Sequence, residues 1–311
     1  MAGELQHHPV LLKEAIEALC IREDGIYVDG TFGRGGHAEA ILGRLGPKGR
    51  LLAIDRDPEA VAVAGRRFGR DARFQIERGA FAMLGQLTAK CGIQGRVDGL
   101  LLDLGVSSPQ LDDPARGFSF ANDGPLDMRM DPGVGVSAAQ WLAEAGIEDI
   151  ADVLKRYGEE RFSRRIAAAI VNTRQETPIR TTRQLADLVC EAVPFRERHK
   201  HPATRSFQAI RIFINNELNE LESVLPQVPD VLSPGGRLAV ISFQSLEDRI
   251  VKRFIRREYR GVEPPPGLPL AGMAHQPRLR PVGKPVRAAR VEVDQNPRSR
   301  SAVLRVAERV S

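Results

Sequence analysis

The stretch Tyr27-Val-Asp-Gly-Thr-Phe-Gly-Arg-Gly-Gly-His37 joins a buried-strand pattern to a glycine-rich turn. The apolar, β-branched run from Ile26 to Val28 predicts a strand, and the residues from Ala38 to Leu45 have helical spacing. Glycine is needed where the backbone approaches a ligand at φ values that other residues disfavour. The helix that follows offers free N–H groups and a positive dipole end. The stretch therefore predicts a strand–turn–helix unit that binds a polar or anionic ligand.

Three predicted strands of this chain end in a carboxylate. Asp29 ends the first, Asp55 ends the run Leu51–Asp55, and Asp103 ends the run Val97–Asp103. An acid about 20–25 residues beyond the glycine turn stands where a ribose-binding carboxylate belongs in a nucleotide-binding fold. We infer that the ligand is an adenosine-containing cofactor.

Two cofactors fit the glycine turn. Gly33-Arg-Gly35-Gly-His-Ala38 matches the loose G-x-G-x-x-G/A dinucleotide pattern, so an NAD-dependent oxidoreductase is one alternative. Asp29 would repel a pyrophosphate, whereas an acid-lined edge suits the sulfonium and ammonium groups of S-adenosylmethionine. The residues therefore favour the methyl donor. A non-catalytic RNA-binding or assembly protein is a second alternative, although the intact acids at all three strand ends argue against it.

The composition is that of an ordinary globular protein, with 311 residues, 42% hydrophobic and 27% charged. No run approaches the roughly 18 apolar residues that cross a bilayer, and the N-terminus does not have the pattern of a signal peptide. Cys20, Cys91 and Cys190 are far apart and form no C-x-x-C pair. We expect a reduced, cytoplasmic protein without a metal site, and the net charge of +5 is compatible with nucleic acid.

The order of patterns predicts an α/β fold with a mostly parallel, doubly wound sheet. Further strands are expected at Arg73–Glu77, Val97–Gly105 and Arg237–Phe243. Helical spacing persists from Ser137 to Val193, and one long helix, Phe207–Val224, is expected to return the chain to the sheet. We therefore expect a helical insertion over residues 135–205, between core segments 1–134 and 206–311.

Two loops carry further candidates. Phe81 follows the third predicted strand, where an aromatic ring can stack on adenine or begin the core of the next helix. The stretch from Gly105 to Asp131 is long, irregular and rich in Gly, Pro and Asp. Loops of this length within a compact domain are usually functional or disordered, and the spacing of Phe, Leu and Met favours an ordered flap.

The C-terminal part is basic. Ser245-Leu-Glu-Asp248 has the form of a capping box with Asp at its last position, and it begins a helix rich in Arg and Lys. We expect the stretch from Pro264–Pro266 to Pro285 to be an exposed basic arm, and the chain to end in a strand. With Arg298 and Arg300, these features predict a phosphate-binding surface.

Motifs along the whole chain resemble the bacterial RsmH (MraW) family, which methylates N4 of a cytidine in the decoding region of small-subunit ribosomal RNA. The matching motifs are His8-x-Pro-Val-Leu-Leu-x-Glu14, Asp29–His37, Asp55-Arg-Asp57, Leu102–Asp112, Arg116–Phe120, Leu126–Met130, His201-Pro-Ala-Thr-Arg205, Ser242–Asp248 and Asn296–Ala302. Together they are far more specific than a single glycine loop.

The resemblance implies a class I S-adenosylmethionine-dependent methyltransferase, Rossmann-like, with an inserted helical substrate-recognition domain. Its cofactor would be held by Gly35, Gly36 and His37 at the amino-acid part, Asp55 at the ribose, Phe81 at the adenine, and Asp103 and Gln110 elsewhere in the pocket. The implied partner is 16S ribosomal RNA or the small ribosomal subunit, at a cytidine of the decoding (P-site) region. Whether the protein is a monomer or a homodimer stays open.

Ser108 is the candidate catalytic residue. Ser107-Ser-Pro-Gln110 resembles the [Asp/Asn/Ser]-Pro-Pro-aromatic motif of other amino-methyltransferases, although the second Pro and the aromatic are missing. Ser108 or a nearby carbonyl would accept a hydrogen bond from the reacting amino group. The alternative is that Ser108 is a turn residue before Pro109.

Overall fold

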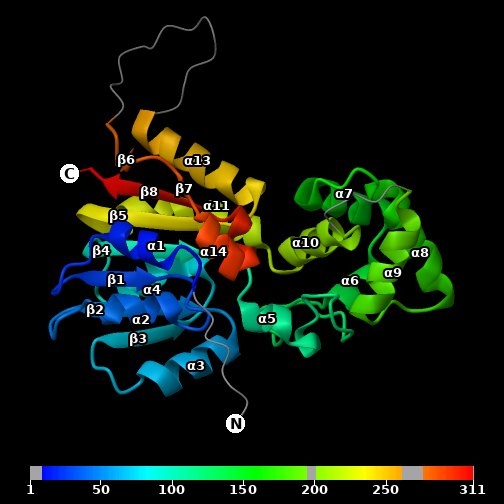
Figure 1. Cartoon of the computed structure of the whole chain (residues 1–311), viewed down its shortest axis with the longest axis horizontal. Helices are drawn as coiled ribbons and strands as arrows, with labels where there is room; N and C mark the ends of the chain where they lie inside the picture. Colours follow the sequence, from blue (N-terminus) through cyan, green and yellow to red (C-terminus); the bar gives the residue numbers. More distant parts are fainter. Residues whose placement is uncertain (1–8, 195–200, 261–275, 311) are drawn as a thin grey trace, which may run out of the picture. The chain divides into compact units, whose positions relative to one another are not determined.

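The computed structural model describes residues 9–194, 201–260 and 276–310. His8 and Pro264–Pro266, which were named above, lie outside these ranges. The chain divides into two compact units, one made of residues 1–105 and 218–311 and the other of residues 106–217 (Figure 1). The segment 135–205 lies within the second unit.

The first unit is built on one sheet with the order β3-β2-β1-β4-β5-β8-β6, and β7 also pairs with β8. Its strands are β1 (Ile26–Asp29), β2 (Arg50–Asp55), β3 (Phe74–Arg78), β4 (Val97–Asp103), β5 (Leu232–Ser242), β6 (Leu279–Pro281), β7 (Val286–Arg287) and β8 (Val303–Arg309). Strands β1 to β5 are parallel, as predicted, and β8 runs antiparallel to β5. The chain order reverses between β1 and β4, where ligands of open α/β sheets bind.

Part of the predicted basic arm is instead sheet. Strand β6 pairs with β8, so the expectation of an exposed arm is wrong for residues 279–281, and β7, just beyond the expected arm, also pairs with β8. Two- and three-residue strands are too short for a periodic pattern, and they form here because β8 offers its edge as a template.

Alternation along β4 divides the core of this unit. Leu100 and Leu102 belong to a cluster with helices α4 (Leu84–Lys90), α12 (Val228–Val231) and α13 (Ser245–Arg260). Leu101 belongs to a second cluster with α1 (Leu12–Leu19), α2 (Gly36–Leu42) and α3 (Pro58–Phe68). Successive strand side chains point to opposite faces, so the sheet is covered by helices on both sides.

The start of α13 differs from the expected capping box. Helix α13 begins at Ser245, and Glu247 accepts hydrogen bonds from the N–H groups of Phe243 (2.9 Å) and Gln244 (3.1 Å). Asp248 instead pairs with Arg305. The acid that reaches back over the helix N-terminus is therefore Glu247, because it stands three residues after Gln244.

The second unit has its own core and is mainly helical. Its helices are α5 (Ser108–Asp112), α6 (Ala138–Glu144), α7 (Ile147–Gly158), α8 (Ser163–Glu176), α9 (Thr182–Ala192) and α10 (Ala203–Ile214). The expected single helix Phe207–Val224 is wrong, because α10 ends at Ile214 and α11 (Glu217–Val224) begins after a break. Asn216 adopts the left-handed φ of 54°, which cannot continue a right-handed helix.

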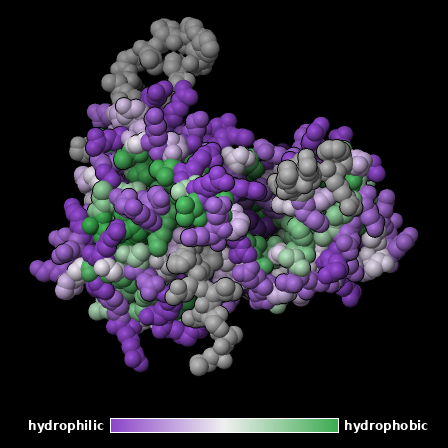
Figure 2. All heavy atoms as spheres, in the orientation of Figure 1, coloured by the Kyte–Doolittle hydropathy of each residue, from purple (hydrophilic) through white to green (hydrophobic). Residues whose placement is uncertain are grey.

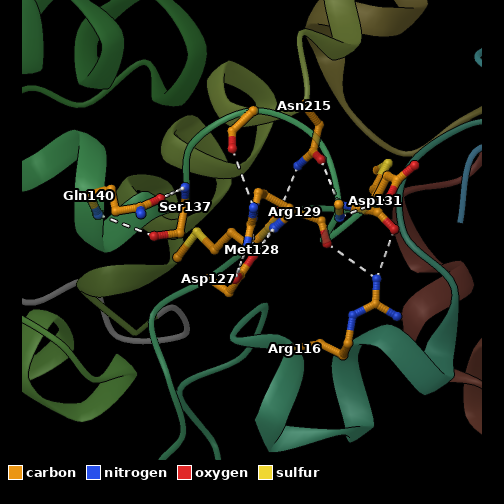
Figure 3. A network of polar contacts seen from close by, with 11 residues as sticks. Arg116, Asp127, Met128, Arg129, Asp131, Ser137, Gln140 and Asn215 are labelled. Atoms are coloured by element: carbon orange, nitrogen blue, oxygen red, sulfur yellow. Dashed lines mark hydrogen bonds and ion pairs between the residues drawn. The ribbon is translucent and has the colours of Figure 1, made fainter.

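A polar network organises the loop between α5 and α6 in this unit (Figure 3). Asn215 donates to the carbonyl of Met128 (2.7 Å) and accepts from the N–H of Met130 (2.7 Å). The Arg116 guanidinium donates to the carbonyl of Met130 (2.9 Å), and Arg129 forms a two-pronged ion pair with Asp127. These bonds hold buried Met128 at the left-handed φ of 64°.

Candidate active site

The glycine turn after β1 is fixed by the strands beside it. The N–H of Gly30 donates to the carbonyl of Leu101 in β4 (2.9 Å), and the N–H of Phe32 donates to the carbonyl of Ile54 in β2 (3.1 Å). Gly35 has a φ of +78°, and a Cβ there would lie 2.5 Å from the Phe32 ring. No other residue type fits Gly35 without displacing that ring, so the requirement for glycine has a steric as well as a conformational cause.

Asp55, at the end of β2, is oriented by backbone groups. Its Oδ2 accepts from the N–H of Gly33 (2.8 Å), and its Oδ1 accepts from the N–H of Asp57 (2.8 Å). Burial raises the pKa of Asp55 to about 6, against the lowering effect of these two hydrogen bonds. Each carboxylate oxygen can accept a second hydrogen bond, so the group can also receive ligand hydroxyls.

Asp29 and His37 are buried, Asp103 is partly buried, and each has a buried atom that is unsatisfied. Among the described residues, Asp29 Oδ2, His37 Nε2 and Asp103 Oδ1 have no hydrogen-bond partner. The Nδ1 of His37 lies 3.6 Å from Oδ2 of Asp103, which exceeds a normal hydrogen bond. Buried polar groups are rarely left unpaired, and a cluster of them indicates a missing ligand.

The charges of this cluster show what ligand it fits. Burial lowers the pKa of His37 to about 4, so its imidazole is neutral at pH 7 and its contact with Asp103 is not an ion pair. Burial raises the pKa of Asp29 to about 7, and burial together with the charges of Asp29 and Glu247 raises the pKa of Asp103 well above its usual range. A ligand bearing positive charge would relieve this repulsion. The ammonium and sulfonium groups of S-adenosylmethionine meet that requirement.

Phe81 lies near the glycine turn, in the short 3-10 helix Phe81–Met83 after β3. A Cβ on Gly30 would be 3.8 Å from the Cβ of Phe81, and the ring is half-buried against the core. Both interpretations of Phe81, a ring that stacks on adenine and a core residue, are compatible with this position.

Ser108 and Gln110 belong to the second unit. Ser108 is the first residue of α5, and the amide oxygen of Gln110 accepts from the N–H of Ser107 at 2.9 Å. Both side chains are buried. Their assigned roles stay predictions.

Two residues that were not singled out in the sequence support the site. The Oγ1 of Thr31 accepts from the N–H of Asp103 at 2.6 Å and so ties the ends of β1 and β4 together. Glu292, in α14 (Arg290–Gln295), accepts from the N–H of Leu11 at 2.8 Å. Thr31 stands inside the glycine motif, but no local signal marks Glu292, because its partner is 281 residues away.

The sheet order, with an antiparallel strand inserted beside β5, and the acid-lined glycine edge define a class I S-adenosylmethionine-dependent methyltransferase. The family model described as "MraW methylase family" matches residues 4–310. The chain belongs to the MraW methylase family.

Curated relatives match over nearly their whole length. The chain is 66% identical to a "Ribosomal RNA small subunit methyltransferase H" of Thioalkalivibrio sulfidiphilus, over 98% of each protein. It is 57% identical to a protein with the same name from Coxiella burnetii, over 98% of this chain and 99% of that one. Among solved structures, a "putative rRNA-methylase" from Clostridium thermocellum matches 99% of each chain with 11% identity and a TM-score of 0.45. In the described part of the chain, no helix has the length and apolar character needed to span a membrane.

Proposed function

We propose that this methyltransferase modifies N4 of a cytidine in the decoding (P-site) region of 16S ribosomal RNA, in the cytoplasm. The observation that carries the cofactor site is the cluster of unsatisfied buried atoms on Asp29, His37 and Asp103. The names of relatives that are 55–66% identical support a ribosomal RNA substrate, and the resemblance of the motifs supports the base and the nitrogen. The helical segment 135–205 would contribute to substrate recognition.

Each candidate cofactor residue has a proposed role. Gly35 and Gly36 would let the backbone approach the amino-acid part, beside His37 and Asp103. Because the pKa of His37 is lowered, its ring is neutral, and it would form a hydrogen bond with the amino-acid part without repelling the sulfonium. The remaining contacts would come from Asp55 at the ribose hydroxyls, Phe81 at the adenine, and Gln110.

The bound cofactor would supply an electrophilic methyl group, and the protein would mainly position the nucleophile. The lone pair of a cytosine amino group is delocalised into the ring, so the site must hold the nitrogen in line with the methyl group and accept its hydrogen bonds. Ser108 or a neighbouring carbonyl would be that acceptor. The base has to leave its stack to reach the site, as enzymes that act on bases generally require.

A calorimetric titration tests the cofactor site. Wild-type protein should bind S-adenosylmethionine, and Asp55→Ala should bind at least tenfold more weakly, because the variant removes the ribose acceptor. Asp24→Ala, at an exposed acid of the same unit, is the matched control and should bind like the wild type. A folded wild type that does not bind the cofactor with or without ribosomal RNA would overturn the proposal.

The product and the acceptor need a second measurement. Small-subunit ribosomal RNA that lacks the modification should yield N4-methylcytidine after incubation with the protein, as read by nucleoside analysis. Ser108→Ala should lower turnover with unchanged cofactor affinity. If turnover is unchanged, Ser108 is only a turn residue.

A further inference from the structure

A concave site lies on the first unit, between α13 and the strands β6, β7 and β8, which lie side by side in Figure 1. It is a groove of about 330 Å³. One wall is the part of α13 from Lys252 to Arg260, with Arg256 and Tyr259, and the other is the turn Pro281–Pro285. None of the residues that line the groove was assigned to the cofactor site.

The charged residues that line the groove are all basic. Five of its 12 lining residues are Lys or Arg, and none is Asp or Glu. Arg305 is committed to Asp248, with bonds of 2.6 and 3.0 Å. By contrast, Lys252, Arg260 and Lys284 are exposed and make no ion pair within the described part of the chain. The groove therefore keeps cations that could bind an external anion.

Three of the basic residues that line the groove form a row along α13. Lys252, Arg256 and Arg260 follow one another at intervals of four residues, on one face of α13. Over eight residues the row extends for about 12 Å. Like charges at this spacing destabilise a helix by about 0.2–0.5 kcal/mol per pair. A polyanion in the groove would offset the repulsion between these cations.

An aromatic ring stands among these cations. Tyr259 is 43% exposed and lines the groove, whereas Phe254 and Ile255 of the same helix are 6% exposed. The surface over α13 is otherwise mostly hydrophilic in Figure 2. Basic grooves that carry exposed aromatic rings bind single-stranded nucleic acid, because the cations contact phosphates and the rings stack on bases.

We propose that this groove binds a single-stranded segment of RNA and forms a contact with ribosomal RNA that is separate from the cofactor site. The assignment rests on the proposed function for the identity of the RNA. Cations on α13 and Lys284 would contact successive phosphates, and Tyr259 would stack on a base. RNA fits better than an acidic peptide, because every base offers the exposed ring a planar face, whereas a peptide offers an aromatic face only where it carries an aromatic side chain.

Binding of 16S ribosomal RNA, measured by filter retention over a series of salt concentrations, tests the groove. The test variant is the triple charge reversal Lys252→Glu, Arg260→Glu and Lys284→Glu, and Lys48→Glu, an exposed lysine before β2, is the control. We expect the triple variant to bind at least tenfold more weakly at physiological salt. Its slope of log affinity against log salt should fall by about 2, at roughly 0.7 per lost phosphate contact. Tyr259→Ala should bind RNA about fivefold or more weakly, because the stacking ring is lost. Tyr259→Phe should keep the wild-type affinity.

The outcomes separate this proposal from the proposed function. If the triple variant has unchanged RNA affinity and an unchanged salt slope, the proposal that the groove binds RNA is overturned, whether or not the protein methylates RNA. Normal binding of naked RNA with reduced activity on assembled subunits also overturns it, in favour of a ribosomal-protein contact. A wild type that binds the cofactor but produces no N4-methylcytidine refutes the proposed reaction. The comparison of RNA binding between wild type and variants still tests whether the groove binds RNA. Calorimetric binding of S-adenosylmethionine checks that each variant is folded.

Discussion

Asp127 in the second unit and Asp29 in the first are both aspartates in loop or strand-end motifs, but their surroundings are opposite. Burial alone would raise the pKa of Asp127, yet the hydrogen bonds from Arg129 outweigh it and hold that pKa below its usual value. Asp29 receives one backbone hydrogen bond, from Thr31 at 3.1 Å, and its pKa is raised to about 7. One unit satisfies its acid internally, whereas the other leaves one oxygen of its acid without a hydrogen-bond partner.

The difference separates structural from functional polar residues. The Asp127 network closes on itself through Arg129, Arg116 and Asn215 (Figure 3), as a stable scaffold requires. The cluster of Asp29, His37 and Asp103 lowers the stability of the ligand-free protein, and binding of a cation would recover that free energy. Motif membership alone does not distinguish the two roles, since both stretches belong to the matching family motifs.

The largest effect should come from Asn215→Ala, which breaks the closed network. This 5% exposed side chain bonds the Met128 carbonyl, the Met130 N–H and the Arg211 carbonyl. Its loss leaves buried backbone groups unpaired and removes the restraint on left-handed Met128. We expect the free energy of unfolding to fall by about 3 kcal/mol, as measured by urea denaturation.

Asn122→Ala is the matched control, because Asn122 is exposed in the same loop. It should change stability by no more than about 0.5 kcal/mol. An Asn215→Ala protein as stable as this control would show that the network does not hold the loop.

A smaller effect of opposite sign is expected for Asp29→Asn in the first unit. The pKa of Asp29 is about 7 in the folded protein and lower when unfolded, so unfolding releases a proton between these values. The contribution of Asp29 to stability is therefore lost as the pH rises from about 4 to about 7. Asn cannot ionise and can still accept from Thr31. The variant should be more stable than the wild type at pH 8 and nearly as stable as the wild type at pH 4.

Urea denaturation of both proteins over this pH range measures that difference, without cofactor. The comparison cancels the opposite slope of His37, whose lowered pKa costs stability as the pH falls below about 6. The same variant should bind S-adenosylmethionine about tenfold more weakly. A stability difference that does not vary with pH would contradict the assignment of a buried, ligand-directed carboxyl.

The smallest effect is expected at Glu292, which acts on the cofactor site through other residues. Glu292 accepts a hydrogen bond from the N–H of buried Leu11, whose φ is 52°. The backbone of the neighbouring residue Val10 forms a hydrogen bond with His37. Glu292→Ala should weaken S-adenosylmethionine binding by about threefold to fivefold, roughly 1 kcal/mol. Glu292→Gln keeps an acceptor oxygen and should restore wild-type affinity. Equal affinities in calorimetry for all three proteins would exclude this positioning role.

Most of the parallel sheet was predictable from local patterns. The expected strands correspond to β1 to β5 within a few residues, and the carboxylates Asp29, Asp55 and Asp103 end β1, β2 and β4 as the sequence indicated. Apolar runs between turn residues predict buried strands because each strand must hide both faces. The helix from Phe207 was predicted too long, because its periodicity continues through Asn215 and Asn216 while the backbone does not.

The amino-acid sequence by itself determined the strand–turn–helix unit at Asp29–His37, the acids at the strand ends and the family, because these depend on residue type and spacing within short segments. Only the tertiary structure decided which polar groups are satisfied. It leaves Asp29 Oδ2 unpaired while Asp127 meets Arg129, and it brings Glu292 to Leu11. It also gathers the cations of α13 and Lys284 around one groove. Hydrogen bonding and desolvation depend on which atoms meet in space, and partners 281 residues apart leave no periodic trace in the chain.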